Sequence, residues 1–266
     1  MTEEPETPAV GEATTPALGV GLQRRVMLHH GNALRLLLDL ETDSVDAVIT
    51  DPPYSSGGLM QHDRIRGQLD KYTGTYGKQP DLPEFSGDAR SYGYWCSLWL
   101  TEALRVVKTG GICAVFADWR QLPTTTDALQ AGGWVWRGVV PWYKPGGRPT
   151  QGRYANQCEY VVWGTNGRRP LTALDGKALP GFYKANSPRE RDHITQKPLS
   201  VMRKLVQIVP PGGVVLDLFA GSGTTAEACK LEGRSCIGFE IEPHFVEVAR
   251  SRVEAVEQAP GLFDAA

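Results

Sequence analysis

Short apolar runs alternate with helical patterns along most of this 266-residue chain, and this alternation is the strongest constraint on its fold. Alternation of this kind is typical of parallel strands joined by helices that cover both faces of one sheet. The sequence therefore predicts an α/β fold with a doubly wound, mainly parallel, seven-stranded Rossmann-like sheet. Strands are expected over 26–29, 45–50, 112–117, 135–142, 159–163, 214–219 and 236–241. Helices are expected over 33–40, 92–107, 124–131, 199–209, 224–232 and 243–256.

Several stretches do not follow this alternation. The acidic, Pro- and Thr-rich residues 1–22 predict a disordered tail, and 259–266 predict a second tail. The single domain expected over 23–258 contains two long polar insertions, 55–90 and 165–192, and loops of this length are usually functional or disordered. The sequences KTGG (108–111) and PPGG (210–213) predict helix-to-strand turns.

Composition excludes some classes of protein. The chain is 41% hydrophobic and 22% charged, which is ordinary for a globular protein, and it has no apolar run of about 18 residues that would predict a membrane span. Its five cysteines are odd in number and show no C-x-x-C spacing, so neither a disulfide framework nor a metal site is expected. Together these features favour a cytoplasmic protein.

Charge is unevenly distributed. Residues 144–197 hold ten Lys and Arg and four Asp and Glu, which gives this stretch +6 in a chain of net charge −2. A local basic segment of this kind indicates either a phosphate-contacting surface or a solvated loop.

The stretch VVLDLFAGSGTTAEACK (214–230) reads as a strand, a tight turn and a helix. Gly221 and Gly223 allow a sharp turn close to a ligand, and the following helix points free N–H groups at it. Glu240, at the end of the next strand, is placed to accept hydrogen bonds from ribose hydroxyls. The pattern Gly221-x-Gly223-x-x-Ala226 also fits a dinucleotide fingerprint. Asp217 favours a ligand with an ammonium group, and S-adenosylmethionine has both a ribose and an ammonium.

A second motif follows the strand expected at 45–50. The sequence TDPPY (50–54) places a carboxylate, two prolines and an aromatic ring at a strand end. Proline fixes its own φ and donates no backbone hydrogen bond, so Pro52 and Pro53 stiffen this turn. A capped turn with a packed Tyr54 is the simplest structural interpretation of this motif alone.

Taken together, TDPPY, TQKP (195–198) and DLFAGSGTT (217–225) resemble the amino-methyltransferases of DNA, over roughly residues 24–257. The order of the motifs is similar to the circularly permuted β group. The resemblance implies methyl transfer from S-adenosylmethionine to N6 of adenine, or alternatively N4 of cytosine, in duplex DNA, with the target base flipped out. It implies that Asp51, Pro52, Pro53 and Tyr54 are catalytic. The implied cofactor-binding residues are Asn32, Thr195, Gln196, Lys197, Asp217, Phe219, Ala220, Gly221, Ser222, Gly223, Thr224 and Glu240.

Recognition of DNA is assigned to the two polar insertions and the basic stretch. The predicted contacts are Arg64, Arg66, Lys144, Arg148, Arg168, Arg169, Arg189 and Arg191. Such side chains contact phosphates or guanine edges. The resemblance also allows a homodimer and a cognate restriction nuclease. Two other classes stay open at this point: a nicotinamide-dependent oxidoreductase, and a DNA-binding protein without catalysis.

Overall fold

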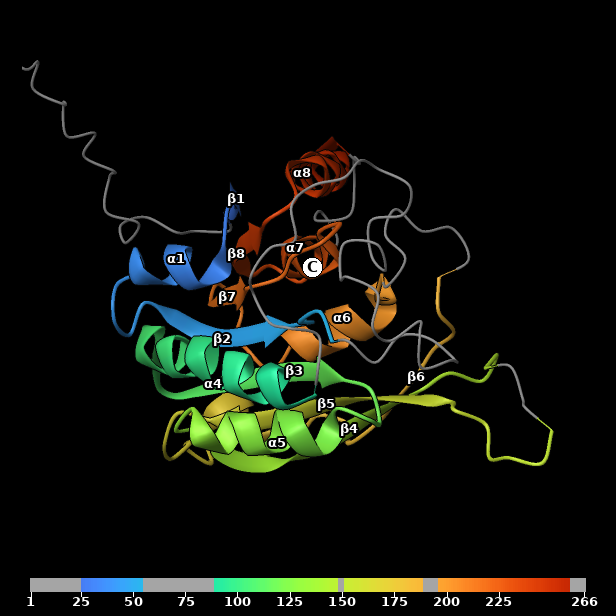
Figure 1. The fold of residues 1–266 in the computed structure, drawn as a ribbon. Helices are drawn as coiled ribbons and strands as arrows, with labels where there is room; N and C mark the ends of the chain where they lie inside the picture. The colour runs from blue at the N-terminus through green and yellow to red at the C-terminus, as the bar shows by residue number, and fades with distance from the viewer. Residues whose placement is uncertain (1–24, 55–88, 148–150, 189–195, 259–266) are drawn as a thin grey trace, which may run out of the picture.

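The computed structural model describes residues 25–54, 89–147, 151–188 and 196–258. Its centre is a single twisted β-sheet. Within these ranges the sheet has eight strands in the order β1-β8-β7-β2-β3-β5-β4-β6 (Figure 1). Strand β5 runs antiparallel to β3 and β4, and the other neighbouring pairs are parallel. The strands are β1 (Val26–His30), β2 (Val45–Thr50), β3 (Val107–Ala117), β4 (Val135–Tyr143), β5 (Cys158–Thr165), β6 (Tyr183–Lys184), β7 (Val214–Asp217) and β8 (Ser235–Glu240).

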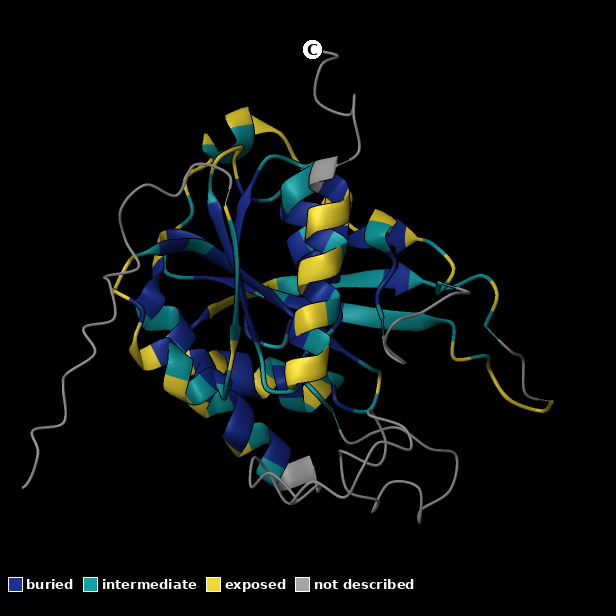
Figure 2. Ribbon diagram, turned by 90° about the horizontal axis from the view of Figure 1, so that it is seen from above, coloured by how far each residue is buried: buried dark blue, intermediate teal, exposed yellow. Residues whose placement is uncertain are grey.

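Helices cover both faces of this sheet, as the sequence predicts. Helices α1, α4 and α5 form one core with the sheet, and α6, α7 and α8 form the other. Figure 2 shows that buried residues of the helices face the strands while exposed ones lie on their outer sides. The helices are α1 (Ala33–Leu38), α4 (Ala89–Val106), α5 (Leu122–Ala131), α6 (Leu199–Val206), α7 (Thr224–Leu231) and α8 (Pro243–Gln258), with a short 3-10 helix η1 (Ala173–Gly176).

Strand β3 shows why the sequence folds this way. Cys113 and Val115 pack into the core beneath α4, whereas Ile112, Ala114 and Phe116 pack into the core beneath α6. Successive side chains of a strand point to opposite faces, so a strand covered on both sides must be apolar throughout. The predicted doubly wound, mainly parallel fold is confirmed.

Two details differ from the sequence prediction. Strand β6 is an eighth strand of only two residues, too short to give a periodic signal. The expected turn at 108–111 lies inside β3, because Val45 pairs with Val107 whereas Ala47 pairs with Ile112. The intervening residues form a bulge in which Gly110 has φ +79°, so the glycines bend a strand here and do not end a helix.

The parallel strands end at one edge, called here the carboxyl edge, where the last residues of β2, β3, β7 and β8 lie. The segment 166–184 connects the two edges of the sheet. It starts beside the bulge of β3, where Asn166 exchanges backbone hydrogen bonds with Gly110 and Gly111. It ends in β6, which pairs with the last residues of β4 at the carboxyl edge. In the described part of the chain, no helix is long and apolar enough to cross a membrane.

Candidate active site

Asp51 lies directly after β2 at the carboxyl edge. Its side chain is 22% exposed, and its Oδ2 accepts a hydrogen bond from the ammonium of Lys197. Its Oδ1 is buried and has no hydrogen-bond partner among the described residues. The next residue, Pro52, is buried. Asp51 therefore presents one carboxylate oxygen that is held and one that is available as an acceptor.

Lys197 connects Asp51 to a second carboxylate. Its Nζ lies 3.4 Å from Oε2 of Glu159, whose Oε1 accepts a hydrogen bond of 2.8 Å from Nζ of Lys144. The hydroxyl of Tyr54 also donates to Oε2 of Glu159, at 3.5 Å. Lys197 is only 6% exposed, so its charge depends on these partners for compensation.

Burial and these neighbours determine the protonation of the cluster. Burial raises the pKa of Asp51 to about 6 against the opposing effect of Lys197. Burial acts to lower the pKa of Lys197, but Asp51 and Glu159 outweigh it and leave that pKa above its ordinary value. Burial likewise acts to raise the pKa of Glu159, which Lys197 and Lys144 nevertheless hold below its usual range. The partners thus favour the charged forms of Lys197 and Glu159.

Thr50 joins the end of β2 to the glycine loop. Its Oγ1 donates to Oδ1 of Asp217 at 2.7 Å and accepts from the amide of Leu218 at 3.2 Å. Oδ1 of Asp217 also accepts from the amide of Phe219 at 3.1 Å. Burial raises the pKa of Asp217. These bonds hold the ends of β2 and β7, which are adjacent and parallel in the sheet, in a fixed relation.

The glycine loop between β7 and α7 needs both of its glycines. Gly223 has φ +81°, and a Cβ there would lie 2.6 Å from Cβ of Ala249 on α8. Gly221 has φ +50°, but a Cβ there would meet nothing within 4 Å. Position 223 thus requires glycine for packing as well as for its conformation, whereas Gly221 borders open space.

Glu240 ends β8 and faces the loop. Its Oε2 accepts from the amide of Gly221 at 2.7 Å, and its Oε1 accepts from the amide of Glu242 at 2.9 Å. Burial raises the pKa of Glu240 to about 7, although the backbone donors oppose the shift. Each carboxylate oxygen retains a further lone pair, so the group can also accept from a hydroxyl of a ligand.

Aromatic side chains of α4 support the loop from below. Phe219 lies 5.3 Å from Trp95 and 5.6 Å from Trp99, measured between ring centroids, and Trp95 contacts Tyr92 at 6.2 Å. These rings belong to the buried core. On the other side, Arg252 of α8 donates to the carbonyl and hydroxyl of Ser222 and lies 3.3 Å from Oγ1 of Thr224. The loop is therefore held by packing on both sides.

The predicted cofactor residues fall into three groups. Phe219, Ala220, Gly221 and Glu240 come together around the loop, with Gln196 and Lys197 on the Asp51 side. The polar oxygens of Ser222 and Thr224 are engaged by Arg252, and the side chain of Asn32 caps α1 by accepting from the amides of Leu34 and Arg35. Thr195 lies outside the described residues. The assigned contacts to a cofactor stay predictions.

The predicted DNA contacts are divided between the two edges. Arg169 donates to the carbonyls of Gly110 and Ile208, which places it and the exposed neighbour Arg168 at the edge opposite Asp51. This position does not support DNA contact beside Asp51. Lys144 lies at the carboxyl edge but is paired with Glu159. The other assigned residues, Arg64, Arg66, Arg148, Arg189 and Arg191, lie outside the described residues, as do most of the expected 55–90 insertion and both tails.

The carboxyl edge has other cationic and aromatic side chains. Trp119, 49% exposed, follows β3, and the guanidinium of Arg120 lies 4.6 Å from its ring centroid. Lys184 of β6 is exposed near the end of β4. Tyr154, fully exposed, lies in the β4–β5 connection, which projects past the helices in Figure 1. By their positions after β3, in β6 and in the β4–β5 connection, these residues belong to the same edge of the sheet as Asp51.

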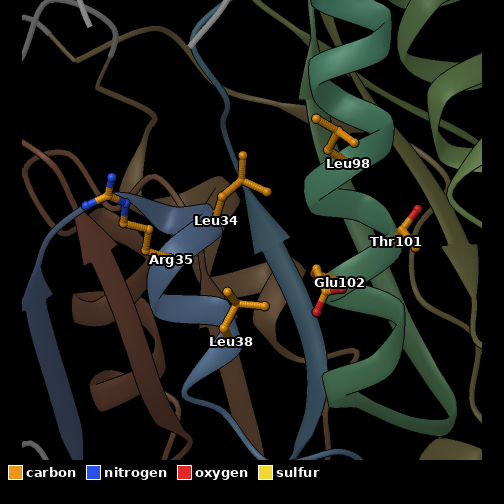
Figure 3. A pocket seen from close by; sticks show the side chains of 6 residues that line it. All are labelled: Leu34, Arg35, Leu38, Leu98, Thr101 and Glu102. Carbon is orange, nitrogen blue, oxygen red and sulfur yellow. The ribbon is translucent and has the colours of Figure 1, made fainter. Parts of the chain in front are cut away.

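A hollow of about 440 Å³ lies elsewhere, between α1 and α4 (Figure 3). It includes none of the predicted site residues and is therefore not the candidate active site. Among the described residues, no cluster of His, Cys, Asp and Glu is suited to a metal ion. The hollow between α1 and α4 is lined by Leu34, Arg35, Leu38, Leu98, Thr101 and Glu102.

Comparison with known proteins identifies the family. A family model described as DNA methylase, N6_N4_Mtase, matches residues 45–251. The chain is 26% identical over 255 residues to the type II methyltransferase M.HinfI of Haemophilus influenzae, covering 86% of this chain and 68% of that one. It is 26% identical over 248 residues to M.HpaI of Haemophilus parainfluenzae, covering 84% and 73%. The chain belongs to the N6/N4 DNA methyltransferase family.

Solved structures agree on the fold. A crystal structure of an M1.HpyAVI-SAM complex is 25% identical, with a TM-score of 0.63 and coverage of 86% of this chain and 98% of that one. The cytosine-N4-specific PvuII DNA methyltransferase has a TM-score of 0.65 at 17% identity, covering 86% of each chain. The Rossmann-like methyltransferase fold is thus confirmed, and the family match decides against the nicotinamide oxidoreductase.

Two residues of the site were missed by sequence reasoning. Thr50 is a polar residue at the end of a buried apolar strand, which is a weak signal for a structural hydrogen bond. Glu159 is an acid at the start of β5, inside the stretch 144–197 that was noted for its basic charge. Neither residue type in isolation indicates its partners, because these come from strands far away in sequence.

Proposed function

We propose that this protein transfers a methyl group from S-adenosylmethionine to the exocyclic N6 of adenine in duplex DNA. The proposal is carried by the available Oδ1 of Asp51, which lies beside a glycine loop joined to it through Thr50 and Asp217. Residues 23–258 act as one catalytic unit in this proposal. The order of the motifs, with Asp51 before Gly221, supports membership of the permuted β group.

The cofactor residues suit this ligand. Glu240 offers oxygens to the ribose hydroxyls, Gly221 leaves space for a ligand beside the loop, and the acidic Asp217 favours an ammonium group. Phe219 offers a supported aromatic face. When bound, S-adenosylmethionine supplies an electrophilic methyl group on its sulfonium.

The target amine is activated by hydrogen bonding. An exocyclic amine is a poor nucleophile because its lone pair is delocalised into the ring. Oδ1 of Asp51 and the carbonyl of Pro52 accept its two N–H groups and draw the nitrogen towards tetrahedral geometry. Both acceptors are held before substrate arrives, which is electrostatic preorganisation. The base reaches them by flipping out of the duplex, where the ring of Tyr54 stacks on it.

The DNA is proposed to lie across the carboxyl edge. Trp119, Arg120, Lys184 and Tyr154 belong to this edge, and in the proposal they supply cations for phosphates and rings for bases. A homodimer, a cognate restriction nuclease and a cytoplasmic location stay predictions.

Adenine is favoured over cytosine by Asp51 itself, since Asp at this position in the resembling family goes mostly with adenine and Ser mostly with cytosine. N4 of cytosine is the alternative target. Mass spectrometry of nucleosides from the DNA of an expressing host distinguishes the two. We expect N6-methyladenine, and N4-methylcytosine alone would contradict the choice of adenine.

A further inference from the structure

Four charged side chains form a continuous chain that ends at Asp51. In order they are Lys144, Glu159, Lys197 and Asp51, each in contact with the next. They come from the end of β4, from β5, from the residues before α6 and from the end of β2. Their charges alternate, two positive and two negative. We call these four residues the charged chain.

The charged chain is shielded from water. Lys197 is 6% exposed, and the other three side chains are between 19% and 22% exposed. Its electrostatic interactions are therefore screened less by salt than those of surface pairs. Burying such ions costs desolvation energy, so a buried ion pair is weak evidence of a role in stability alone. A role in the chemistry of the adjacent Asp51 accounts for it better.

The position of Lys197 is a balance between two carboxylates. Its ammonium bonds Oδ2 of Asp51 and lies 3.4 Å from Oε2 of Glu159. Glu159 in turn forms ion pairs with both Lys197 and Lys144, one at each carboxylate oxygen. How strongly Lys197 is held against Asp51 therefore depends on Glu159, and how strongly Glu159 attracts Lys197 depends on Lys144.

From this geometry we infer that Glu159 is a positioning residue for methyl transfer, acting on Asp51 through Lys197. The inference rests on the proposed function, in which Oδ1 of Asp51 accepts an N–H of the target amine. Glu159 keeps Lys197 bound to Oδ2 alone, which leaves Oδ1 for the amine. It also offsets the positive charge of Lys197 where positive charge develops on the attacking nitrogen.

The inference predicts that substitutions along the charged chain shift the pKa of Asp51 in alternating directions. The charged and titratable groups that face Asp51 are Lys197, Glu159, Asp217 and Tyr92, with Lys144 behind Glu159. Lys197→Met removes the main stabiliser of ionised Asp51, so the pKa of Asp51 rises above about 6, by about one unit or more. Glu159→Gln removes a negative neighbour and releases Lys197 to Asp51, so that pKa falls. Lys144→Met lets Glu159 draw Lys197 away, so that pKa rises again.

The test is a carbon-13 NMR titration of Asp carboxyl groups in the full chain, which needs no DNA and no cofactor. The resonance of Asp51 is the one absent from the Asp51→Asn spectrum. We expect the order of apparent pKa values Glu159→Gln below wild type, then Lys144→Met and Lys197→Met above it. The acid limb of the single-turnover rate with saturating duplex DNA and S-adenosylmethionine should move in the same order, while the cofactor Kd of Glu159→Gln and of Lys144→Met stays unchanged.

The matched control is Glu247→Gln on α8, where a 69% exposed Glu pairs with Arg250. It should leave the titration of Asp51 and the rate unchanged. An Asp51 pKa that stays constant, or that moves in one direction for all three variants, would overturn the inference. If Glu159→Gln does not fold, as judged by circular dichroism, an unshifted Lys144→Met variant overturns it. Wild-type protein that methylates no DNA contradicts the proposed function, whereas the NMR order reports on the charged chain independently.

Discussion

Two carboxylates at the carboxyl edge, Asp51 and Glu240, are both desolvated but are held in different ways. Asp51 is bonded by the flexible side chain of Lys197, and one of its oxygens has no described partner. Glu240 is bonded by the backbone amides of Gly221 and Glu242, one on each oxygen. Burial raises the pKa of both groups, to about 6 and about 7.

The difference matches the two tasks that the proposed function gives these residues. Backbone donors are fixed by the fold, so Glu240 is set for binding that does not change during the reaction. The side-chain ammonium of Lys197 can move, and its position depends on its other partners. Asp51 is therefore suited to a role in which its charge matters as the reaction proceeds. Substitutions at the two carboxylates and around them separate these tasks.

Asp51→Asn should strongly lower the rate of methyl transfer and leave the binding of S-adenosylmethionine unchanged. The amide keeps the shape of the side chain but loses the charge that accepts the amine N–H. Removing one preorganised electrostatic contact of this kind costs about 100-fold or more in rate. We expect that loss in single-turnover methylation, with the calorimetric Kd for S-adenosylmethionine unchanged. Near-normal turnover would contradict the mechanism.

Glu240→Gln should show the opposite pattern. A hydrogen bond to a charged group contributes about 1.5–3 kcal/mol, which corresponds to roughly 10- to 100-fold in affinity. Isothermal titration should report weaker S-adenosylmethionine binding by that factor. At saturating cofactor the rate should recover most of its wild-type value. A lowered rate with unchanged affinity would remove the ribose role from Glu240.

Gly223→Ala tests the backbone that supports the cofactor region. The added methyl group would lie 2.6 Å from Cβ of Ala249, and φ is +81°. A left-handed Ala and an overpacked contact together should lower the free energy of unfolding by about 2 kcal/mol or more. Urea denaturation measures the change. Gly212→Ala, also with positive φ but with nothing within 4 Å of its Cβ, separates strain from packing.

The raised pKa of Glu240 also predicts a pH dependence of stability. A carboxyl group with a raised pKa in the folded state stabilises the fold fully below its ordinary pKa of 4.5, and this contribution is lost as the pH rises through about 7. The cofactor-free protein should therefore lose part of its stability between these values. Glu240→Gln should lack that part. Thermal melts at pH 5 and pH 8 measure it, and equal differences for both proteins would contradict the assignment.

The smallest expected effect compares the two edges of the sheet. Arg120 lies at the carboxyl edge and Arg168 at the opposite one. Each phosphate contact contributes about one unit to the slope of log K against log salt. Arg120→Ala should reduce this slope for duplex DNA by about one, whereas Arg168→Ala should not change it. The reverse result would return DNA contact to the residues that the sequence favoured.

The sequence predicted most of the fold and the two motifs of the site. The strand ends at Asp51, Asp217 and Glu240 can be predicted from the sequence because apolar runs stop there. The glycine spacing predicts the loop between β7 and α7. Which strands lie next to each other in the sheet cannot be predicted from the sequence pattern. The contacts of Thr50 with Asp217 and of Glu159 with Lys197 were therefore missed. Arg168 and Arg169 were assigned from their charge and their place in the 165–192 insertion, and neither property tells the two edges of a sheet apart.

The most direct test of the account is methylation of duplex DNA by purified protein with S-adenosylmethionine carrying a deuterated methyl group, followed by mass spectrometry of the nucleosides. Wild-type and Glu240→Gln protein at saturating cofactor should both produce deuterated N6-methyladenine, and Asp51→Asn should produce almost none. Label in N6-methyladenine at wild-type rate with Asp51→Asn, or no labelled nucleoside with wild type, would contradict the account.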